Sequence, residues 1–192
     1  MSYTPRCTWP ATDPLMIEYH DQEWGVPLHD DQKWFEFIVL DAFQAGLSWK
    51  TILHKRGNFR KALDGFDPVL ISKYQEDKVQ ELMQDAGIIR NQLKIRSTIT
   101  NALSFLEIQK EYGSFDRYIW GFTDRKVIQN SWKSMQEVPA KTPLSDEISK
   151  SLKKRGFKFV GSTIVYAFLQ SAGVVNDHVC ECFRHSELGS KR

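Results

Sequence analysis

Residues 39–49 read VLDAFQAGLSW, and this stretch decides how the rest of the chain is organised. Its first half continues an apolar helical pattern into which one acid, Asp41, is inserted. Gly46 then allows a sharp turn, Ser48 can cap the next helix, and Trp49 falls in the first turn of that helix. An acid and a tryptophan should therefore face one gap, which suits a flat, hydrogen-bonding and cationic ring. The alternative is that Asp41 lies on the polar face of an amphipathic helix, because unpaired Asp is almost never buried.

Composition indicates an ordinary folded protein. The chain has 192 residues, of which 41% are hydrophobic and 26% charged, and its formal net charge is +2. This length allows one domain with a sizeable core, so we expect a single domain over residues 1–192, acting as a monomer. Any affinity for nucleic acid must come from a local patch, because the total charge is small. No apolar run approaches the roughly 20 residues of a membrane span, and residues 1–7 do not resemble a signal peptide. The sequence predicts a cytoplasmic protein with reduced cysteines and no membrane partner.

Glycine and proline separate a series of helical patterns, while strand-like alternation is scarce, so the predicted fold class is all-α. Four prolines should keep residues 1–29 irregular, although this arm is rich in aromatic and metal-binding residues. Residues 126–141 are polar and are expected to form a surface excursion. Helices are expected at about 30–43, 48–63, 68–75, 79–86, 95–106, 145–155 and 162–172.

Two turns could hold DNA phosphates. Residues 77–105 pair two helices through a tight turn, which is the pattern of a helix-hairpin-helix, whose backbone N–H groups can hold a phosphate without reading a base. An αα-hairpin without a nucleic-acid role has the same pattern. A second glycine turn, at residues 153–158, concentrates four basic residues, although the helix dipole also favours cations at a helix C-terminus. The candidate DNA-binding residues are Gly87, Arg90, Lys153, Lys154, Arg155 and Lys158.

The ends of the chain carry candidate metal ligands. His178 and Cys182 are one helical turn apart, so both side chains can reach one ion. Two ligands do not close a tetrahedral site, and Cys7 and His20 could supply the other two. The result would be a Cys2His2 site without an open position for water, and therefore a structural one. Spacing alone leaves other ligand sets open. The other candidates in the tail are Cys180 and His185.

Six motifs along the chain are long or unusual in composition: Cys7-x-Trp9, YHDQEWGVP at residues 19–27, QAGLSW at 44–49, DAGIIR at 85–90, KKRGFKFVG at 153–161 and VNDH at 175–178. Together they resemble the motifs of the 3-methyladenine DNA glycosylase I family. They span nearly the whole chain in the family's order. The resemblance implies an α-helical fold of the helix-hairpin-helix glycosylase superfamily. It also implies base-excision repair of alkylated double-stranded DNA, in which hydrolysis of the N-glycosidic bond releases free 3-methyladenine and leaves an abasic site.

The resemblance further implies a structural zinc (Zn2+) clasp on four residues, joining residues 7–20 to residues 178–182. These ligands are Cys7, His20, His178 and Cys182.

The same resemblance implies a base pocket of Trp9, Tyr19 and Trp49, with Asp41 at its acidic, catalytic position. The rings would stack on the base, and Asp41 would accept a hydrogen bond from its exocyclic amine. The best-known members of the family have Glu where this chain has Asp41. The shorter side chain withdraws the charge by roughly 1.5 Å, so contact would need a backbone shift or a bridging water.

Three questions stay open at the level of sequence. Asp177 lies near the superfamily's catalytic region, but it could equally be a hydrogen-bonding partner of the metal ligand His178. A non-catalytic damage-binding protein is a second possible function, which the three retained pocket aromatics disfavour. A zinc hydrolase is a third, which four available protein ligands disfavour because a hydrolytic zinc needs an open position.

Overall fold

The computed structural model describes residues 5–189 and confirms the mostly helical fold. Within that range there are ten α-helices and two short strands, and the strands pair in parallel. The α-helices are α1 Pro14–Gln22, α2 Asp31–Gln44, α3 Trp49–Ala62, α4 Pro68–Ile71, α5 Glu76–Gln84, α6 Gln92–Tyr112, α7 Phe115–Trp120, α8 Pro143–Lys154, α9 Ser162–Ser171 and α10 Phe183–Gly189. Single 3-10 turns lie at Asp64–Phe66, Gly121–Thr123 and Met135–Glu137, and the strands are β1 Ile128–Gln129 and β2 Val175–Asn176.

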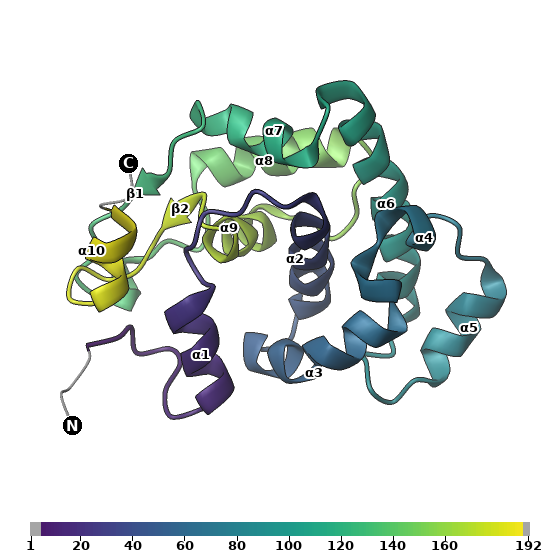
Figure 1. The fold of residues 1–192 in the computed structure, drawn as a ribbon, viewed down its shortest axis with the longest axis horizontal. Helices are drawn as coiled ribbons and strands as arrows, with labels where there is room; N and C mark the ends of the chain where they lie inside the picture. Colours follow the sequence, from purple (N-terminus) through teal and green to yellow (C-terminus); the bar gives the residue numbers. More distant parts are fainter. Residues whose placement is uncertain (1–4, 190–192) are drawn as a thin grey trace.

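Helix α2 is central to the fold. Figure 1 shows it in the middle of the molecule beside α9, with α3 below it, α4 to α6 to its right, and α7 and α8 above in this view. Asp30 caps its start by accepting from the N–H of Lys33 at 2.8 Å. All ten residues at 34–43 are buried, Asp41 included. The polar-face interpretation of Asp41 is therefore wrong, and the carboxyl group belongs to the core.

The expectation that residues 1–29 are irregular is also wrong, because they contain α1. Pro14 occupies the first turn of this helix, where a missing N–H costs nothing. Asp13 caps the helix by accepting from the N–H groups of Leu15 and Met16, both at 3.1 Å. The proline therefore marks where a helix begins instead of preventing one.

The polar segment 126–141 is more firmly attached than expected. Strand β1 pairs with β2, which joins this segment to the C-terminal part of the chain. The indole N–H of Trp132 donates to Asp177 at 2.7 Å, and the carbonyl of Trp132 accepts from the N–H of Cys180 at 2.8 Å. These hydrogen bonds hold the segment against residues 177–180 near the end of the described chain.

Each of the two predicted turns lies between helices. Helices α5 and α6 flank the turn at Gly87, and α8 and α9 flank the basic turn near Gly156. The two ends of the described chain also meet, since the N–H of Phe183 donates to the carbonyl of Pro5 at 3.0 Å (Figure 1). Within residues 5–189, none of the helices combines the length and the apolar character that crossing a membrane requires.

Candidate functional site

The four predicted metal ligands form one buried cluster. The ligand atoms of Cys7, His20, His178 and Cys182 all lie within 4.8 Å of one another. The sulfur of Cys182 is 3.5 Å from His20 Nε2 and 3.4 Å from His178 Nδ1, and the sulfur of Cys7 is 3.6 Å from His178 Nδ1. Tetrahedral zinc, with thiolates at about 2.3 Å and imidazoles at about 2.0 Å, would separate S and N by about 3.5 Å. The residues therefore fit a tetrahedral metal ion.

The hydrogen bonds around the cluster orient its histidines. His20 Nδ1 lies 2.8 Å from Asp21, which Arg6 grips through two nitrogens. His178 Nε2 lies 3.0 Å from the carbonyl oxygen of Trp24. Each ring therefore has one nitrogen held by an acceptor and the other turned to the cluster, which is how proteins orient metal-binding histidines.

The thiol chemistry of the cluster also suits a metal. The pKa of Cys182 is lowered, chiefly because the thiol of Cys7 donates to its sulfur and also because His178 and His20 face it. The thiolate is the form that binds metal ions. The two alternative ligands lie elsewhere: Cys180 is exposed, and the ring of His185 is 2.8 Å from the carbonyl oxygen of Asn130. The structure thus selects the Cys2His2 set from the combinations that spacing left open.

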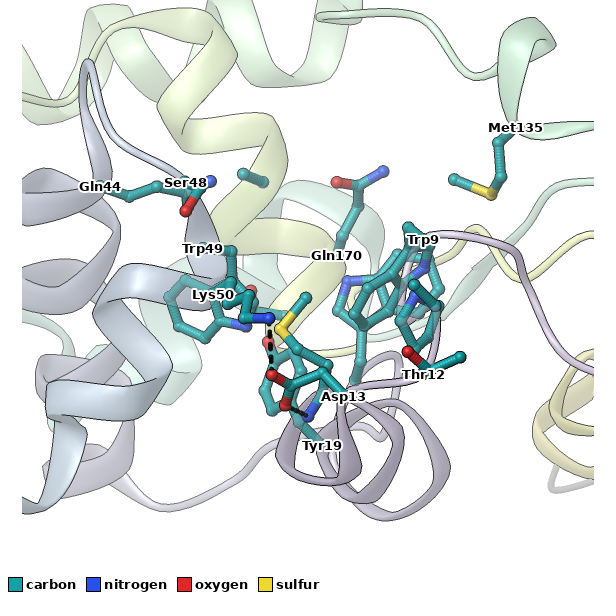
Figure 2. Close-up of a pocket in the computed structure, with 16 residues that line it drawn as sticks. Trp9, Thr12, Asp13, Tyr19, Gln44, Ser48, Trp49, Lys50, Met135 and Gln170 are labelled. Carbon is teal, nitrogen blue, oxygen red and sulfur yellow. Dashed lines mark hydrogen bonds and ion pairs between the residues drawn. The ribbon is translucent and has the colours of Figure 1, made fainter.

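An aromatic pocket lies beside this cluster. Its volume is about 480 Å³, and Trp9, Tyr19 and Trp49 are among its lining residues. The rings of Tyr19 and Trp49 are 5.1 Å apart, and those of Trp9 and Tyr19 are 6.2 Å apart. Figure 2 shows Trp49 and Trp9 on opposite sides of the pocket in that view, with Gln170 between them. The structure therefore brings together the three aromatic residues that the sequence proposed for a base pocket.

The metal cluster and the pocket share their supporting residues. Trp9 packs on His20, with ring centroids 5.3 Å apart, and on Trp24, at 5.2 Å. Trp24 in turn lies 4.5 Å from the ring of His178. Tyr19 and His20 are neighbours in α1, so the same turn of helix supplies one residue to each site. A metal ion bound by the four ligands should consequently fix the positions of Trp9 and Tyr19 on the pocket wall.

The pocket residues carry polar atoms that have no partner. Within the described part of the chain, six buried side-chain nitrogen or oxygen atoms lack a hydrogen bond. Three of the six belong to the pocket residues Trp9, Tyr19 and Trp49, and two belong to Asp41, which does not line the pocket. Buried polar atoms are normally paired, so such a concentration indicates a place where a ligand completes the hydrogen bonding.

Asp41 lies behind the pocket. It is 1% exposed and is absent from the lining residues; it borders a small apolar space with Ile38 and Phe168 instead. Burial holds the pKa of Asp41 well above its usual range, and the positive charge of Arg56 opposes that rise only in part. Burial also raises the pKa of Tyr19, to which the charge of Asp41 contributes. The carboxyl group therefore acts electrostatically on a residue of the pocket wall.

Asp177 is fully engaged with side chains other than His178. Its Oδ1 accepts from Asn130 at 2.6 Å and from Trp132 at 2.7 Å. Its Oδ2 accepts from Tyr166 at 2.5 Å and from Gln170 at 2.7 Å. The interpretation of Asp177 as a partner of His178 is therefore wrong, because the free ring nitrogen of His178 uses a backbone carbonyl. Through these hydrogen bonds Asp177 links helix α9 to residues 130–132, which precede Met135 in the polar segment.

Sequence reasoning missed most of the other residues of the pocket wall, among them Gln170 and Met135. Gln170 comes from α9, and Met135 comes from the polar segment that we expected to be a surface excursion. Neither belongs to a motif that signals a ligand site. Met135 reaches the pocket because the hydrogen bond of Trp132 to Asp177 brings its segment there.

The predicted phosphate-binding residues differ in availability. The side chains of Arg90, Lys153, Lys154 and Lys158 are exposed, and within residues 5–189 they make no hydrogen bond or ion pair. Arg155 is engaged instead, because it binds both carboxylate oxygens of Glu111, at 2.6 and 3.0 Å.

The backbone N–H of Gly87 donates to the carboxylate of Asp85 at 2.7 Å, so this amide already has an anionic acceptor. Lys55 donates to the carbonyl of Gly87 at 3.1 Å. The turn is thus held by charged side chains on both sides, and a phosphate at this amide would have to replace Asp85.

A buried lysine connects the basic turn to the pocket rim. Lys94 is 6% exposed and donates to the carbonyls of Phe43 and Ala45 at the end of α2, at 2.8 and 2.6 Å. Its ammonium lies 5.9 Å from the ring of Phe159 in the α8–α9 turn. Desolvation lowers the pKa of Lys94. The turn and the loop that leads to Trp49 therefore lie against the same side chain.

Comparisons with known proteins agree with this geometry. The DNA-3-methyladenine glycosylase 1 of Escherichia coli (strain K12) is 49% identical over 177 residues, which cover 92% of this chain and 95% of that protein. The DNA-3-methyladenine glycosylase of Haemophilus influenzae is 44% identical over 179 residues, which cover 93% of this chain and 97% of that protein. A crystal structure of a 3-methyladenine DNA glycosylase I superposes with a TM-score of 0.91 at 48% identity, covering 93% of this chain and 98% of that chain.

A further solved structure concerns the ligand. It is a single-residue variant of a 3-methyladenine DNA glycosylase I in complex with 3-methyladenine, with a TM-score of 0.90 at 30% identity, covering 93% of this chain and 96% of that chain. The family model for methyladenine glycosylases matches residues 9–185, which include the pocket, both candidate phosphate-binding turns and every residue of the metal cluster except Cys7. The chain belongs to the methyladenine glycosylase family.

Proposed function

We propose that this protein is a DNA-3-methyladenine glycosylase that acts in base-excision repair. It hydrolyses the N-glycosidic bond of 3-methyladenine in alkylated double-stranded DNA, releases the free base and leaves an abasic site. The aromatic pocket carries this proposal, because its wall combines three rings with buried, unpaired polar atoms of Trp9, Tyr19 and Trp49. A planar base with a hydrogen-bonding edge satisfies both features.

Recognition begins with extrusion of the base from the stack, which costs least for a damaged base. Methylation at N3 makes adenine cationic and a good leaving group. Trp9, Tyr19 and Trp49 stack on the extruded ring, and a cation–π contact in a desolvated site is worth about 2 kcal/mol. Water then attacks the sugar carbon as the base departs.

Asp41 supplies a negative charge when the cationic base binds, because a nearby cation favours the ionised form of its buried carboxyl group. The support is its complete burial, the absence of a hydrogen-bond partner for either oxygen, and its effect on the pKa of Tyr19. A charge in such a site attracts a cation more strongly than it would in water. A bridging water or a small shift of α2 would let the carboxylate accept from the exocyclic amine.

The metal is proposed to be zinc, bound by Cys7, His20, His178 and Cys182. Thiolate and imidazole ligands in a tetrahedral arrangement suit this ion. With four protein ligands it would supply a cross-link between the chain ends and no open position for the reaction. The four residues keep Trp9 and Tyr19 in place on the pocket wall.

The function is tested by release of bases from methylated DNA, with the products identified by chromatography. The wild type is expected to release 3-methyladenine. Trp49→Ala should reduce the rate about 10-fold, because base–aromatic stacking is worth about 1–3 kcal/mol. Leu103→Ala, at a side chain 53% exposed on α6, is the control and should leave the rate unchanged. A wild type that binds methylated DNA but releases no base would instead support a damage-binding protein.

DNA is proposed to lie over the two basic turns, with Lys153, Lys154 and Lys158 at one and Arg90 at the other, near Gly87. Arg155 supports its turn through Glu111, and a phosphate contact from Arg155 would require that pair to open. The contact of Lys94 with Phe159 supports a single face that includes the pocket rim.

Charge reversal tests this face. Lys158→Glu is expected to weaken binding to duplex DNA about 10-fold at low salt, because one phosphate contact is lost and repulsion is added. The slope of log affinity against log salt should become flatter by about 0.9 per lost contact. Lys33→Glu is the control, because Lys33 lies in the first turn of α2, at the end remote from the pocket. Titration by fluorescence anisotropy at several salt concentrations measures both the affinity for duplex DNA and the slope of its salt dependence. Unchanged binding by the Lys158 variant would remove this turn from the DNA-binding surface.

A further inference from the structure

One ion pair stands at the rim of the aromatic pocket. Among its lining residues, Lys50 is the one cationic side chain and Asp13 the one acidic side chain. The ammonium of Lys50 lies 2.9 Å from Asp13 Oδ2, and the pair joins the start of α3 to the start of α1 (Figure 2). The Lys50 side chain is 59% exposed, whereas that of Asp13 is 11% exposed.

Asp13 does not depend on Lys50 for its hydrogen bonds. Its Oδ1 accepts from the N–H groups of Leu15 and Met16, and its Oδ2 also accepts from His54 Nε2 at 2.9 Å. The ammonium can therefore leave without exposing an unpaired carboxylate. Ion pairs with a largely exposed partner are weak, so another anion can compete for Lys50 at little cost.

The position of Lys50 is unfavourable for α3 itself. Ser48 is the N-cap, which places Lys50 in the first helical turn, and that turn contains no acidic residue. The positive end of the helix dipole repels a cation there and attracts an anion. A lysine in the first turn is locally unfavourable for the helix, and such locally unfavourable residues are expected at functional positions. An anion bound by Lys50 would remove the conflict.

We infer that Lys50 binds a backbone phosphate beside the extruded nucleotide. The inference rests on the proposed function. A base that enters the pocket stays attached to its sugar, so its flanking phosphates remain at the mouth, where Lys50 lies. A lysine suits this task because it is a point charge on a flexible stem and needs no fixed approach geometry.

Replacement of Asp13 by a phosphate as the partner of Lys50 also leaves binding of a cationic base unopposed. Without DNA, the Asp13 carboxylate neutralises Lys50, and with DNA the phosphate does so. At no stage does an uncompensated ammonium face the pocket. Lys50 would then add affinity for DNA without repelling the damaged base.

Three variants test the inference: Lys50→Ala, Lys50→Arg and, as control, Lys61→Ala. Lys61 is exposed on the same helix, 11 positions further along and therefore about 16 Å away. The DNA probe is a duplex with a tetrahydrofuran abasic analogue, titrated by anisotropy at several salt concentrations. Free 3-methyladenine is titrated separately through tryptophan fluorescence.

Lys50→Ala is expected to weaken duplex binding about 3- to 10-fold at low salt and to flatten the salt slope by about 0.9. Affinity for the free base should not change, Lys50→Arg should restore the slope, and Lys61→Ala should match the wild type. An unchanged slope, or an equal loss of affinity for the free base, would overturn the inference. Failure of the proposed function would be visible separately, as absence of base release by the wild type.

Discussion

Asp41→Asn is expected to slow release of 3-methyladenine about 100-fold while making the folded protein more stable. Asparagine has nearly the same shape, so the change removes the ability of residue 41 to carry a negative charge beside the cationic base and little else. At an effective dielectric constant of 20, unit charges 4 Å apart attract by about 4 kcal/mol, and a loss of about 2.7 kcal/mol corresponds to 100-fold in rate. Single-turnover base release from methylated DNA measures the effect.

The gain in stability follows from the burial of Asp41. In the free protein both carboxyl oxygens are buried without a partner, and the pKa is raised well above its usual range by desolvation. A raised pKa in an acid means that the folded state holds the proton more tightly than the unfolded state does. The contribution of Asp41 to stability is then largest below about pH 3.9 and declines as pH rises through the folded-state pKa. Asp41→Asn should lack that decline, which urea unfolding at a series of pH values would show.

Two further variants serve as controls for Asp41→Asn. Glu107→Gln removes an exposed carboxylate on α6 and should change neither rate nor stability. Asp41→Glu restores the length found in the best-known members of the family and should keep the activity. A wild-type rate in the Asn variant would assign recognition of the cationic base to the aromatic rings alone.

The parts of the site that depend on local spacing could be predicted from the sequence. The pattern of Gly46, Ser48 and Trp49 correctly placed a turn, a cap and the start of a helix. The spacing of His178 and Cys182 indicated two metal ligands, although Cys7 and His20 could be assigned to them only through the family resemblance. These features follow from helical geometry or from motifs that are long enough to be specific.

Features that depend on packing between distant segments could not be predicted. Asp41 looked as if it would face the gap beside Trp49, yet it lies behind the wall, because α9 covers that side of α2. Met135 reaches the pocket only through the attachment of its segment to Asp177. The basic residues of the turn at 153–158 looked equivalent in the sequence, but Arg155 is paired with Glu111, which lies far away along the chain. Periodicity reports which face of a helix is apolar, not which segment covers that face.

Cys182→Ser is expected to abolish metal binding and to lower stability by at least about 3 kcal/mol, which corresponds to a fall of roughly 6–12 °C in Tm for a domain of this size. The structural reason is that the cluster holds together segments from both ends of the chain, with all four ligands buried. Without the metal, two histidines and a thiol would share a desolvated space with no ion to bind. Metal content by mass spectrometry and Tm by calorimetry measure the two effects.

Cys180→Ser is the matched control, because this thiol is exposed and lies only two positions away. It should retain one metal ion per chain and the wild-type Tm. A chelator should lower the Tm of the wild type to that of Cys182→Ser and leave Cys182→Ser unchanged. Base release should fall together with metal content, since Trp9 packs on His20 and Tyr19 adjoins it in α1. Full activity and unchanged Tm in metal-free protein would show that packing alone holds the pocket wall, and the cluster would then have no structural role.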